Sequence, residues 1–371
     1  MPEFIPGLEL SRLFYEEAVK PILDADFPNL RYDAALIDSG SEVLGFDTEM
    51  SRDHHWGPRV SIFVTAEDAS QVTMPKLADA IDRAMRRKLP YTFRGYSTSF
   101  EPIPDEPHIL RFAERTEGEV NHRVSVVVLR DVIRGYLGFD LNDDLTAADW
   151  LSFPQQKLRT LTHGAVYHSG LGEVDAMRER LRYYPRDVWL YLMAAGWTRI
   201  SQEEPFMGRT GDVGDELGSR VIAARLVRDL MMLAFLIERV YAPYPKWFGT
   251  GFSRLACAAQ LTPIFHRVFA AETWREREVP LSEVYSIVAD MHNALSITAP
   301  LPKDVSPFHG RPYQVIHGEV FSEALMSEIR DPEVKRIAAA PPIGALDQFS
   351  DSTDLRENAS LRERIKGLYE V

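Results

Sequence analysis

Hydrophobic positions in the first part of the chain mark short strands and two helices. Residues 34–37 and 60–64 are apolar runs bounded by polar and turn-forming residues, which predicts two buried β-strands. Residues 124–129 are rich in β-branched side chains and predict a third, central strand. Residues 9–23 and 74–88 carry apolar side chains at helical spacing, which predicts two amphipathic helices. This order of elements predicts a small sheet domain.

From about residue 145 onward, the apolar positions follow helical spacing almost throughout. Helical patterns cover six segments, at residues 155–162, 184–203, 215–241, 247–258, 262–271 and 272–295. The polar, glycine-rich residues 208–216 are predicted to form a loop that can line a substrate pocket. The expected fold class is therefore α+β, with a small mixed-sheet domain at residues 1–140 and a mostly α-helical bundle domain at residues 141–371.

Composition agrees with this picture and narrows the choice of partners. The 371 residues include 45% hydrophobic and 26% charged side chains, as in ordinary folded domains. The chain is long enough for two such domains. Its 42 basic and 55 acidic residues give a net charge of −13. Because a polyanion is bound mainly through basic side chains, long nucleic acid is not expected as a partner.

Cysteine usage and the apolar segments indicate a cytoplasmic protein. Cys257 is the single cysteine, so no intrachain disulfide is expected, which suits a reducing compartment. It lies in an apolar helical run and is interpreted as a core residue. The first residues lack the pattern of a signal peptide, and the longest apolar stretch, around residues 230–237, is too short to cross a bilayer. We expect no membrane partner.

A Gly-Ser turn after the first strand is the most informative local feature. Gly40 and Ser41 follow residues 34–37, and such a turn can bring backbone N–H groups close to a phosphate. Asp53 precedes the second strand, where its carboxylate can hold the divalent metal that a nucleotide carries. Because an isolated Gly-Ser turn is common, the combination with Asp53 is what predicts a phosphate and metal site.

The sequence around these residues resembles the nucleotidyltransferase superfamily, whose signature is a Gly-Ser turn followed by Asp-x-Asp or Asp-x-Glu on the next strand. Residues 40–47 (GSEVLGFD) and 51–59 (SRDHHWGPR) are similar to one bacterial family of that superfamily, described as a domain of unknown function. Residues 183–189, 224–229 and 241–247 are similar to the same family. The resemblance implies a nucleotidyltransferase that uses an NTP, with ATP expected first, together with Mg²⁺ or Mn²⁺. It leaves the acceptor open.

Asp53 and His55 are the predicted metal ligands and catalytic residues. We expect both side chains on one face, because alternate residues of a strand share a face. The superfamily carries an acid at the second position, and an imidazole there suits Mn²⁺ or Zn²⁺ better than Mg²⁺. A third acid is expected from the strand at residues 124–128, which carries none. Glu119 just before this strand and Asp131 just after it are the nearest catalytic candidates.

Other side chains remain open as metal ligands. Asp47 and Glu49 have the spacing of alternate strand residues, but they lie close to the Gly-Ser turn. A transition-metal site would instead join Asp53 and His55 to further histidines, for which the sequence offers His122, His163 and His168. Alternatively, residues 54–56 form a turn that packs against a neighbouring domain and binds no metal.

The helical part offers side chains for the triphosphate and for the acceptor. In aminoglycoside adenylyltransferases and their relatives, a helical domain contributes a lysine that contacts the triphosphate, and Lys246 is similar in placement. The alternative is that Lys246 is a surface lysine beside an aromatic side chain and does not contact a phosphate. Arg225 and Arg228 share a helix face, where they reach phosphates or pair with Asp229 and Glu238. Three acids remain open as the general base, namely Glu203, Glu204 and Glu216.

Three functions of different kinds follow from these residues. The first is an enzyme that transfers a nucleoside monophosphate from an NTP to a hydroxyl group of a small-molecule or macromolecular acceptor. The second is a nucleotide-binding sensor or interaction protein without catalysis, as His55 and the missing strand acid indicate. The third is a metal-dependent hydrolase built on the histidines.

Overall fold

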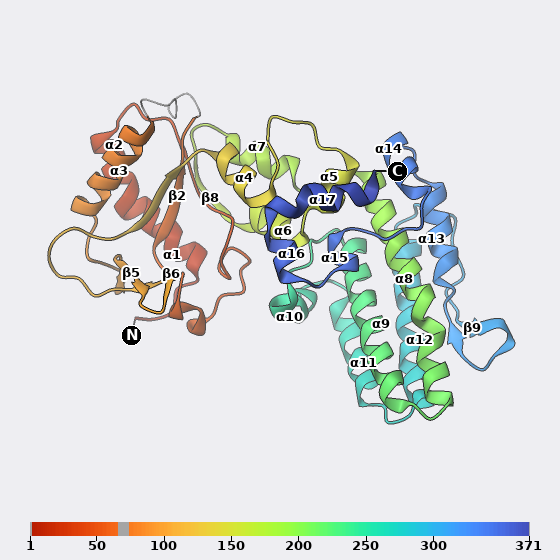
Figure 1. Cartoon of the computed structure of the whole chain (residues 1–371). Helices are drawn as coiled ribbons and strands as arrows, with labels where there is room; N and C mark the ends of the chain where they lie inside the picture. Colours follow the sequence, from red (N-terminus) through yellow and green to blue (C-terminus); the bar gives the residue numbers. More distant parts are fainter. Residues whose placement is uncertain (1, 66–73, 371) are drawn as a thin grey trace. The chain divides into compact units, whose positions relative to one another are not determined.

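The computed structural model describes residues 2–65 and 74–370, and the chain forms two compact units (Figure 1). Unit 1 contains Met1–Asp144 and Lys157–Arg182, and unit 2 contains Leu145–Gln156 and Tyr183–Val371. The chain thus leaves unit 1, enters unit 2 and returns once to unit 1. The expected α+β class is confirmed, because a small mixed sheet lies in the N-terminal part and the C-terminal part is helical.

Unit 1 is built on a four-stranded mixed sheet with the strand order β7-β2-β1-β8. The strands have the bounds β1 (Asp33–Leu36), β2 (Arg59–Phe63), β7 (Arg123–Val127) and β8 (Ala165–Ser169). β2 and β7 are parallel, whereas β1 is antiparallel to both β2 and β8. β1, β2 and β7 confirm the three predicted strands, with small shifts at their ends. β8 lies outside the predicted strands.

The N-terminal helices cover one face of this sheet. Val60, Ile62 and Val124 belong to the same buried cluster as Leu10 and Ile81 of two helices. The helices and helical turns of unit 1 are α1 (Gly7–Phe14), η1 (Tyr15–Val19), α2 (Lys20–Asp26), η2 (Glu49–Asp53), α3 (Met74–Lys88), α4 (Leu129–Leu137), α7 (Glu173–Arg180) and α6 (Gln155–His163), which begins in unit 2. The two helices predicted in this part of the chain are therefore present. Two antiparallel hairpins complete it, β3 (Thr92–Phe93) with β4 (Tyr96–Ser97) and β5 (Phe100–Ile103) with β6 (Glu106–Phe112).

The other face of the sheet carries polar side chains where β2 and β7 begin. Arg59 is the register partner of Arg123, and Ser61 is the register partner of Ser125. Because alternate residues of a strand share a face, these four side chains lie opposite the valines that pack on the helices. The Ser61 and Ser125 hydroxyl oxygens are 2.9 Å apart. The sheet thus separates its apolar core from a polar face.

Asp33 on β1 binds the segment between β8 and α7. Its carboxylate is buried and accepts the backbone N–H groups of Leu171, Gly172 and Val174 at 2.7, 2.9 and 3.1 Å. N–H groups at the start of a helix have no partner within the helix, and the helix dipole favours a negative charge there. One side chain of β1 therefore fixes the turn that follows β8.

Unit 2 is a bundle of long helices (Figure 1). The longest are α8 (Arg186–Asp212), α9 (Glu216–Ile237), α11 (Ala258–Ala270), α12 (Trp274–Ala294) and α13 (Gly318–Ser327). α8 packs against α9 and α13, and α12 packs against α8, α9 and α11. Leu190, Leu226 and Val284 are among the fully buried side chains at these contacts. The predicted helical bundle is confirmed.

Shorter elements complete unit 2. They are α5 (Ala147–Ser152), η3 (Pro245–Trp247), α10 (Phe248–Phe252), β9 (Ser306–Pro307), η4 (Phe308–Gly310), β10 (Gln314–Val315), α14 (Pro332–Ala338), α15 (Leu346–Phe349), α16 (Thr353–Glu357), η5 (Ala359–Leu361), α17 (Arg362–Lys366) and η6 (Gly367–Tyr369). α17 packs on α5, where Asp149 binds Arg362 and Lys366. Within residues 2–65 and 74–370, no helix combines the length and the apolar composition that crossing a membrane requires.

The glycine-rich segment that was predicted to be a loop is largely part of α8, which continues to Asp212. Gly208 and Gly211 lie against Tyr313 and Trp274, whose rings occupy the space that a Cβ atom would need. The prediction of a pocket-lining loop was therefore wrong. Glycine at these positions lets α8 approach two aromatic side chains closely, and it does not end the helix.

Candidate functional site

The Gly-Ser turn lies where β1 ends and β2 begins, and Gly40 is its constrained residue. Gly40 has a φ of +130°, a conformation that residues with a side chain rarely adopt. A Cβ atom at this position would lie 2.5 Å from Nη2 of Arg59 and 2.6 Å from Oε2 of Glu42. Gly40 therefore allows the turn to approach the Arg59–Glu42 ion pair closely.

Arg59 and Glu42 form a buried ion pair beside this turn. Nε and Nη2 of Arg59 lie 2.9 and 2.7 Å from Oε1 of Glu42, and Nη2 also donates to the backbone oxygen of Ser39. The Glu42 side chain is only 3% exposed. Removing one member of such a pair would leave an uncompensated buried charge, which costs about 3–5 kcal/mol. The pair therefore holds the residue after Gly40-Ser41 against the first residue of β2.

Arg123 stands beside Arg59 at the start of β7. Its Nη1 donates to the backbone oxygen of His55, and its guanidinium lies 5.5 Å from the centre of the Phe100 ring. Among the residues that the structure describes, no carboxylate forms an ion pair with Arg123. Burial, and then the neighbouring charge of Arg59, lower the pKa of Arg123 to about 10. Glu42 and Asp38 act on this charge from beyond ion-pair distance, so Arg123 carries a partly buried positive charge with no carboxylate in direct contact among the described residues.

His55 connects Arg123 to the β6 strand. Its backbone N–H donates to the backbone oxygen of Leu110 at 2.8 Å, and its φ is +54°. Burial lowers the pKa of His55, and the positive charge of Arg123 lowers it further. The imidazole is therefore neutral near pH 7, and this residue lies in a loop before β2.

Asp53 is the last residue of η2, and its side chain is 63% exposed. Its Oδ2 lies 2.9 Å from Nδ1 of His54. The expectation that Asp53 and His55 alternate on a strand was wrong, because β2 begins only at Arg59, after Gly57 and Pro58. Within the described ranges, no three His, Cys, Asp or Glu side chains gather in a way that could hold a metal ion. Metal binding by Asp53 and His55 stays a prediction.

Asp47, the alternative metal-binding acid, accepts hydrogen bonds that connect two parts of unit 1. Its Oδ2 accepts the N–H of Gly7, at the start of α1, at 2.7 Å and the indole N–H of Trp56 at 3.0 Å. Glu49 lies 3.9 Å from Arg52 on the surface. Asp47 therefore joins α1 to the loop before β2, whereas Glu49 forms an exposed ion pair.

The two candidates for a third acid bind separate arginines. Oε1 of Glu119 lies 3.2 Å from Nε of Arg87 on α3, and Oδ1 of Asp131 lies 3.4 Å from Nη1 of Arg134 on α4. More than half of each acidic side chain is exposed. The structure shows both acids in surface ion pairs, so a catalytic role of Glu119 stays a prediction.

The three further histidines lie in different surroundings. The His122 side chain is buried, with its Nε2 3.4 Å from Oδ1 of Asp82, and burial lowers its pKa. His168 on β8 packs against the rings of Tyr15 and Tyr32. His163 is the last residue of α6. Since His168 is held by aromatic packing and His122 by Asp82, the geometry does not favour a shared transition-metal site.

Side chains predicted to bind the triphosphate from the helical part are mostly engaged within unit 2. Arg225 forms an ion pair with Glu203, and Arg228 lies 2.5 Å from Asp351 and 3.7 Å from Asp229. Pairing with Asp229, one of the two predicted alternatives, is therefore observed for Arg228. The ammonium group of Lys246 is exposed and lies 5.1 Å from the ring centre of its neighbour in η3, Trp247. Phosphate binding by Arg225 and Lys246 stays a prediction.

The general-base candidates support the packing of unit 2. Glu204 is buried and accepts the N–H groups of Ile316 and Gly318 at 2.6 and 3.2 Å, and burial raises its pKa to about 8. Glu216 accepts the N–H of Trp274 at 2.9 Å. Burial raises the pKa of Glu203, although Arg225 opposes that shift. Two of the three acids thus hold backbone groups of other elements.

Cys257 is buried, as expected for a core residue. Burial and its contact with Glu238 raise the pKa of its thiol to about 12. Because the thiolate is the nucleophilic form, this environment makes Cys257 unreactive near pH 7. Glu238 itself accepts the N–H groups of Ala256 and Cys257, each at 2.8 Å.

Sequence reasoning did not find Arg123 or Glu42, the two side chains that complete the polar end of the sheet. A signal was present for the first, because the triplet Arg-Val-Ser occurs both at residues 59–61 and at residues 123–125. In each triplet the valine faces the core, and the flanking side chains share the polar face. Glu42 gave no comparable signal, since its partner Arg59 is distant in sequence.

Comparison with known proteins finds one family model that matches part of the chain and a solved structure of low similarity. Residues 150–248 match the family model described as Domain of unknown function (DUF4037), a region that includes α8 and α9. No curated protein matches the chain significantly. A crystal structure of a nucleotidyltransferase-like protein from Exiguobacterium sibiricum 255-15 is similar at 10% sequence identity and a TM-score of 0.32, over 86% of this chain and 89% of that one. A likeness this distant gives no residue-by-residue correspondence.

Proposed function

We propose that unit 1 binds the phosphate groups of a nucleotide at the polar end of its sheet, with Arg123 as the principal contact. The observation that carries this proposal is the partly buried guanidinium of Arg123, which lies beside Arg59 and, among the described residues, has no carboxylate within ion-pair distance. A buried charge is costly unless an opposite charge compensates it. A bound phosphate would supply that charge, and the planar guanidinium suits phosphate oxygens.

The serine hydroxyls extend this site along the strands. Ser61 and Ser125 follow the two arginines on the same face, and Ser125 is exposed. Two residues of a strand span about 6.6 Å, so a single phosphate would not bridge Arg123 and Ser125 closely. A chain of linked phosphates, as in a nucleoside triphosphate, fits this spacing better. The Gly-Ser resemblance noted above also supports a nucleotide.

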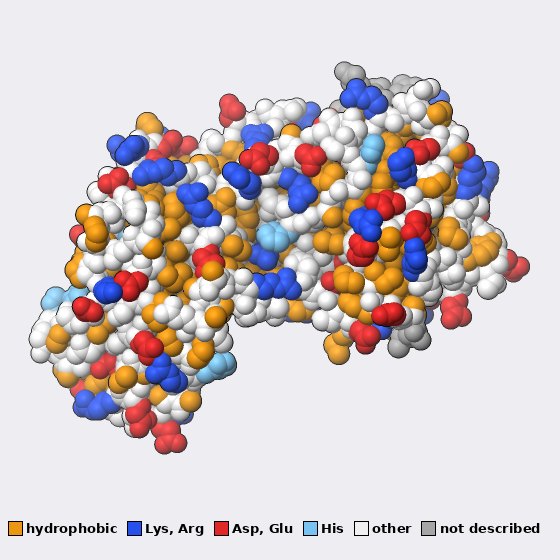
Figure 2. Space-filling view, turned by 180° about the vertical axis from the view of Figure 1, so that it is seen from behind, with side chains coloured by type: hydrophobic (Ala, Val, Ile, Leu, Met, Phe, Trp, Pro, Cys, Tyr) orange, Lys and Arg blue, Asp and Glu red, His pale blue; other side chains and the backbone are white. Residues whose placement is uncertain are grey.

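Basic side chains on the surface do not suggest a polyanion as the ligand. Figure 2 shows Lys and Arg side chains interspersed with Asp and Glu side chains on one face of the molecule. The net charge of −13 points in the same direction. A small nucleotide that is held by local arginines is therefore favoured over long nucleic acid.

Transfer of a nucleoside monophosphate to a hydroxyl acceptor is the second candidate function. The observation that favours it is the hydrogen bond that Arg123 donates to the backbone oxygen of His55, which lies two residues after Asp53. A phosphate held by Arg123 would lie near the segment that carries the predicted metal ligands. As they stand, however, these side chains do not form a metal centre. Nucleotide binding is therefore the favoured function, and no metal-dependent step is proposed.

Calorimetric titration with ATP tests the binding proposal. We expect Arg123→Gln to weaken ATP binding roughly 10- to 100-fold, since a hydrogen bond to a charged group contributes about 1.5–3 kcal/mol. Arg123→Lys should lose less, because it keeps the charge. Arg111→Gln is the matched control, since Arg111 is half exposed and pairs with Glu101 on a neighbouring hairpin strand. Equal affinity of the wild type and Arg123→Gln would refute the proposed site.

Pyrophosphate release in the presence of Mn²⁺ or Mg²⁺ tests transfer separately. If Asp53 binds the metal, Asp53→Asn should reduce turnover by about 10²-fold, because electrostatic stabilisation is usually the largest catalytic contribution. Asp105→Asn, an exposed acid in the β5–β6 turn, is the control. Turnover that Asp53→Asn leaves unchanged would remove Asp53 from the mechanism. ATP binding without pyrophosphate release would leave binding as the function.

A further inference from the structure

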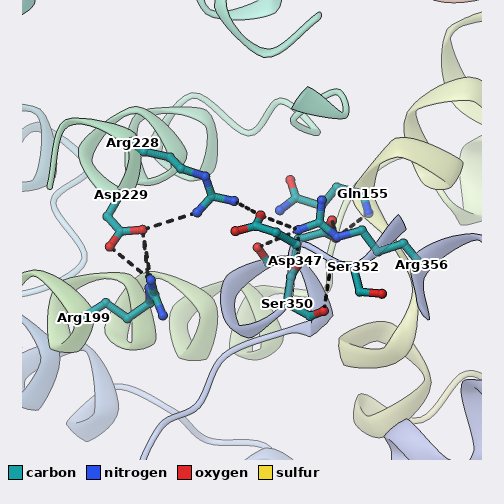
Figure 3. Close-up of polar contacts among 9 residues, drawn as sticks. Gln155, Arg199, Arg228, Asp229, Asp347, Ser350, Ser352 and Arg356 are labelled. Carbon is teal, nitrogen blue, oxygen red and sulfur yellow. Dashed lines mark hydrogen bonds and ion pairs between the residues drawn. The ribbon is translucent and has the colours of Figure 1, made fainter. Parts of the chain in front are cut away.

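Unit 2 contains a second polar site, which the proposed function does not use. A cavity of about 200 Å³ lies beside α9, the segment that leads into α10, and the C-terminal segment around α15 and α16. Arg228, Arg356 and Asp347 form its polar side (Figure 3). Met232, Pro243 and Phe248 contribute to its apolar side. We propose that this cavity binds a small organic acid that consists of one apolar ring and a carboxylate.

Two arginines from distant parts of the chain meet at this cavity. Arg228 comes from α9 and Arg356 from α16, and both hold the carboxylate of Asp351. The Oδ1 atom of Asp351 lies 2.5 Å from Nη2 of Arg228 and 3.3 Å from Nη2 of Arg356. The Asp351 side chain is 69% exposed, so it is only loosely enclosed. An exposed carboxylate of the chain thus occupies the position between two guanidinium groups that line the cavity.

The polar side of the cavity is held in place by buried contacts. The Arg356 side chain is 10% exposed, and its Nε lies 3.4 Å from Oδ1 of Asp347. The other oxygen of Asp347 accepts the N–H of Gln155 at 2.7 Å. The Gln155 side chain in turn accepts the N–H of Ala242 at 2.9 Å. The geometry of Arg356 is therefore fixed before a ligand arrives, which lowers the entropic cost of binding.

The apolar side sets the size and shape of the ligand. Met232 and Pro243 are buried, whereas Phe248 is partly exposed beside them. Gly251 lies against the Pro243 ring, since a Cβ atom at residue 251 would come within 2.7 Å of Cγ of Pro243. A cavity of about 150 Å³ is enough to bind benzene. A volume of about 200 Å³ therefore accommodates one ring with a small substituent and is too small for a whole nucleoside triphosphate.

The existing contacts favour a carboxylate as the charged group. A carboxylate offers two oxygens in one plane, which matches the planar guanidinium fork. The chain already places a carboxylate there, that of Asp351, and a ligand carboxylate would take its place between the two guanidinium groups while the exposed Asp351 turns to solvent. The ring of the ligand would then lie against the apolar wall. Asp351 competes with the ligand in this arrangement, so the free protein keeps its arginines paired.

Calorimetry on the full chain with benzoate as the probe tests this proposal. We expect benzoate to bind and benzamide, its neutral analogue of similar shape, to bind at least about 10-fold more weakly, since it cannot form the charged bonds. Equal affinities for the two compounds would overturn the proposal, as would the absence of benzoate binding. Tighter binding of phenyl phosphate than of benzoate would overturn the choice of a carboxylate.

Two variants identify the site. Asp351→Asn should strengthen benzoate binding several-fold, because it removes the competing carboxylate, whereas Asp354→Asn, an exposed acid three residues away, should not. Arg228→Gln should weaken binding about 10-fold, whereas Arg220→Gln on the same helix should not. Unchanged affinity in both Asp351→Asn and Arg228→Gln would place the probe elsewhere. Because Asp351 is exposed, its variant keeps the test decisive even if Arg228→Gln fails to fold.

Discussion

Replacing Gly40 by alanine should destabilise unit 1 far more than a glycine replacement in an ordinary turn. The φ of +130° alone costs a residue with a side chain about 1–3 kcal/mol. The new Cβ atom would also lie 2.5 Å from Arg59 and 2.6 Å from Glu42. Displacing even part of this buried pair adds about 2 kcal/mol, given that losing it entirely costs about 3–5 kcal/mol. We therefore expect a loss of roughly 4 kcal/mol in the free energy of unfolding of unit 1.

Gly118→Ala is the matched control for this measurement. Gly118 also has a positive φ, +77°, but a Cβ atom there would come no closer than 3.8 Å to its nearest neighbour, Arg115. That variant should lose only about 1 kcal/mol, the cost of the left-handed conformation. The difference between the two variants therefore measures the contact with the Arg59–Glu42 pair.

Hydrogen exchange is the suitable assay, because a chain of two units need not unfold in one step. Exchange rates of peptides from β1 and β2 report the local stability of unit 1, and peptides from α8 serve as an internal reference. If Gly40→Ala lowers protection in β1 and β2 no more than Gly118→Ala does, the Gly-Ser turn does not support the ion pair. The structural role that we assign to Gly40 would then be wrong.

Two further predictions concern the pH dependence of unit 2. Although burial opposes it, hydrogen bonds from Lys366 and Thr146 lower the pKa of Asp149 from 3.8 to about 2, so the stability from this group is present above about pH 5 and is lost as the pH falls toward 2. Urea unfolding should give a lower free energy of unfolding at pH 3 than at pH 6 in the wild type. The difference between the two pH values should be smaller in Asp149→Asn. Burial raises the pKa of Glu204 from 4.5 to about 8, so the folded state keeps a proton that the unfolded state releases, and stability should fall as the pH rises through this interval. Glu204→Gln should lack this slope, because Gln does not titrate, and an identical slope in both proteins would contradict the assignment.

The fold could be predicted wherever a local pattern decided it. The β-branched runs gave β1, β2 and β7, and the helical spacing of apolar residues gave the bundle of unit 2. β8 was missed because its place in the sheet depends on pairing with β1 and on Asp33, which is distant in sequence. Gly208 and Gly211 suggested a loop because glycine weakens isolated helices, but packing against Trp274 and Tyr313 keeps them helical.

The candidate site was only partly predictable, for the same reason. Gly40 has a positive φ, which glycine adopts readily, whereas phosphate binding by the Gly40-Ser41 turn stays a prediction. The expectation that Asp53 and His55 alternate on one strand was wrong, because β2 begins only after Gly57 and Pro58, with Asp53 at the end of η2 and His55 in the loop that follows. The roles of Arg59 and Arg123 emerge only when β2 and β7 lie side by side.

The sequence by itself determined the two kinds of domain, since the spacing of apolar residues along a segment sets which face it buries. It also determined that residue 40 allows a backbone that other residues rarely adopt. Only the tertiary structure decided which charges meet. In unit 1, folding brings Arg59 and Arg123 together from remote positions in the chain. In unit 2, it does the same for Arg228 and Arg356. Coulomb interactions depend on distance in space, and a linear sequence does not contain that distance.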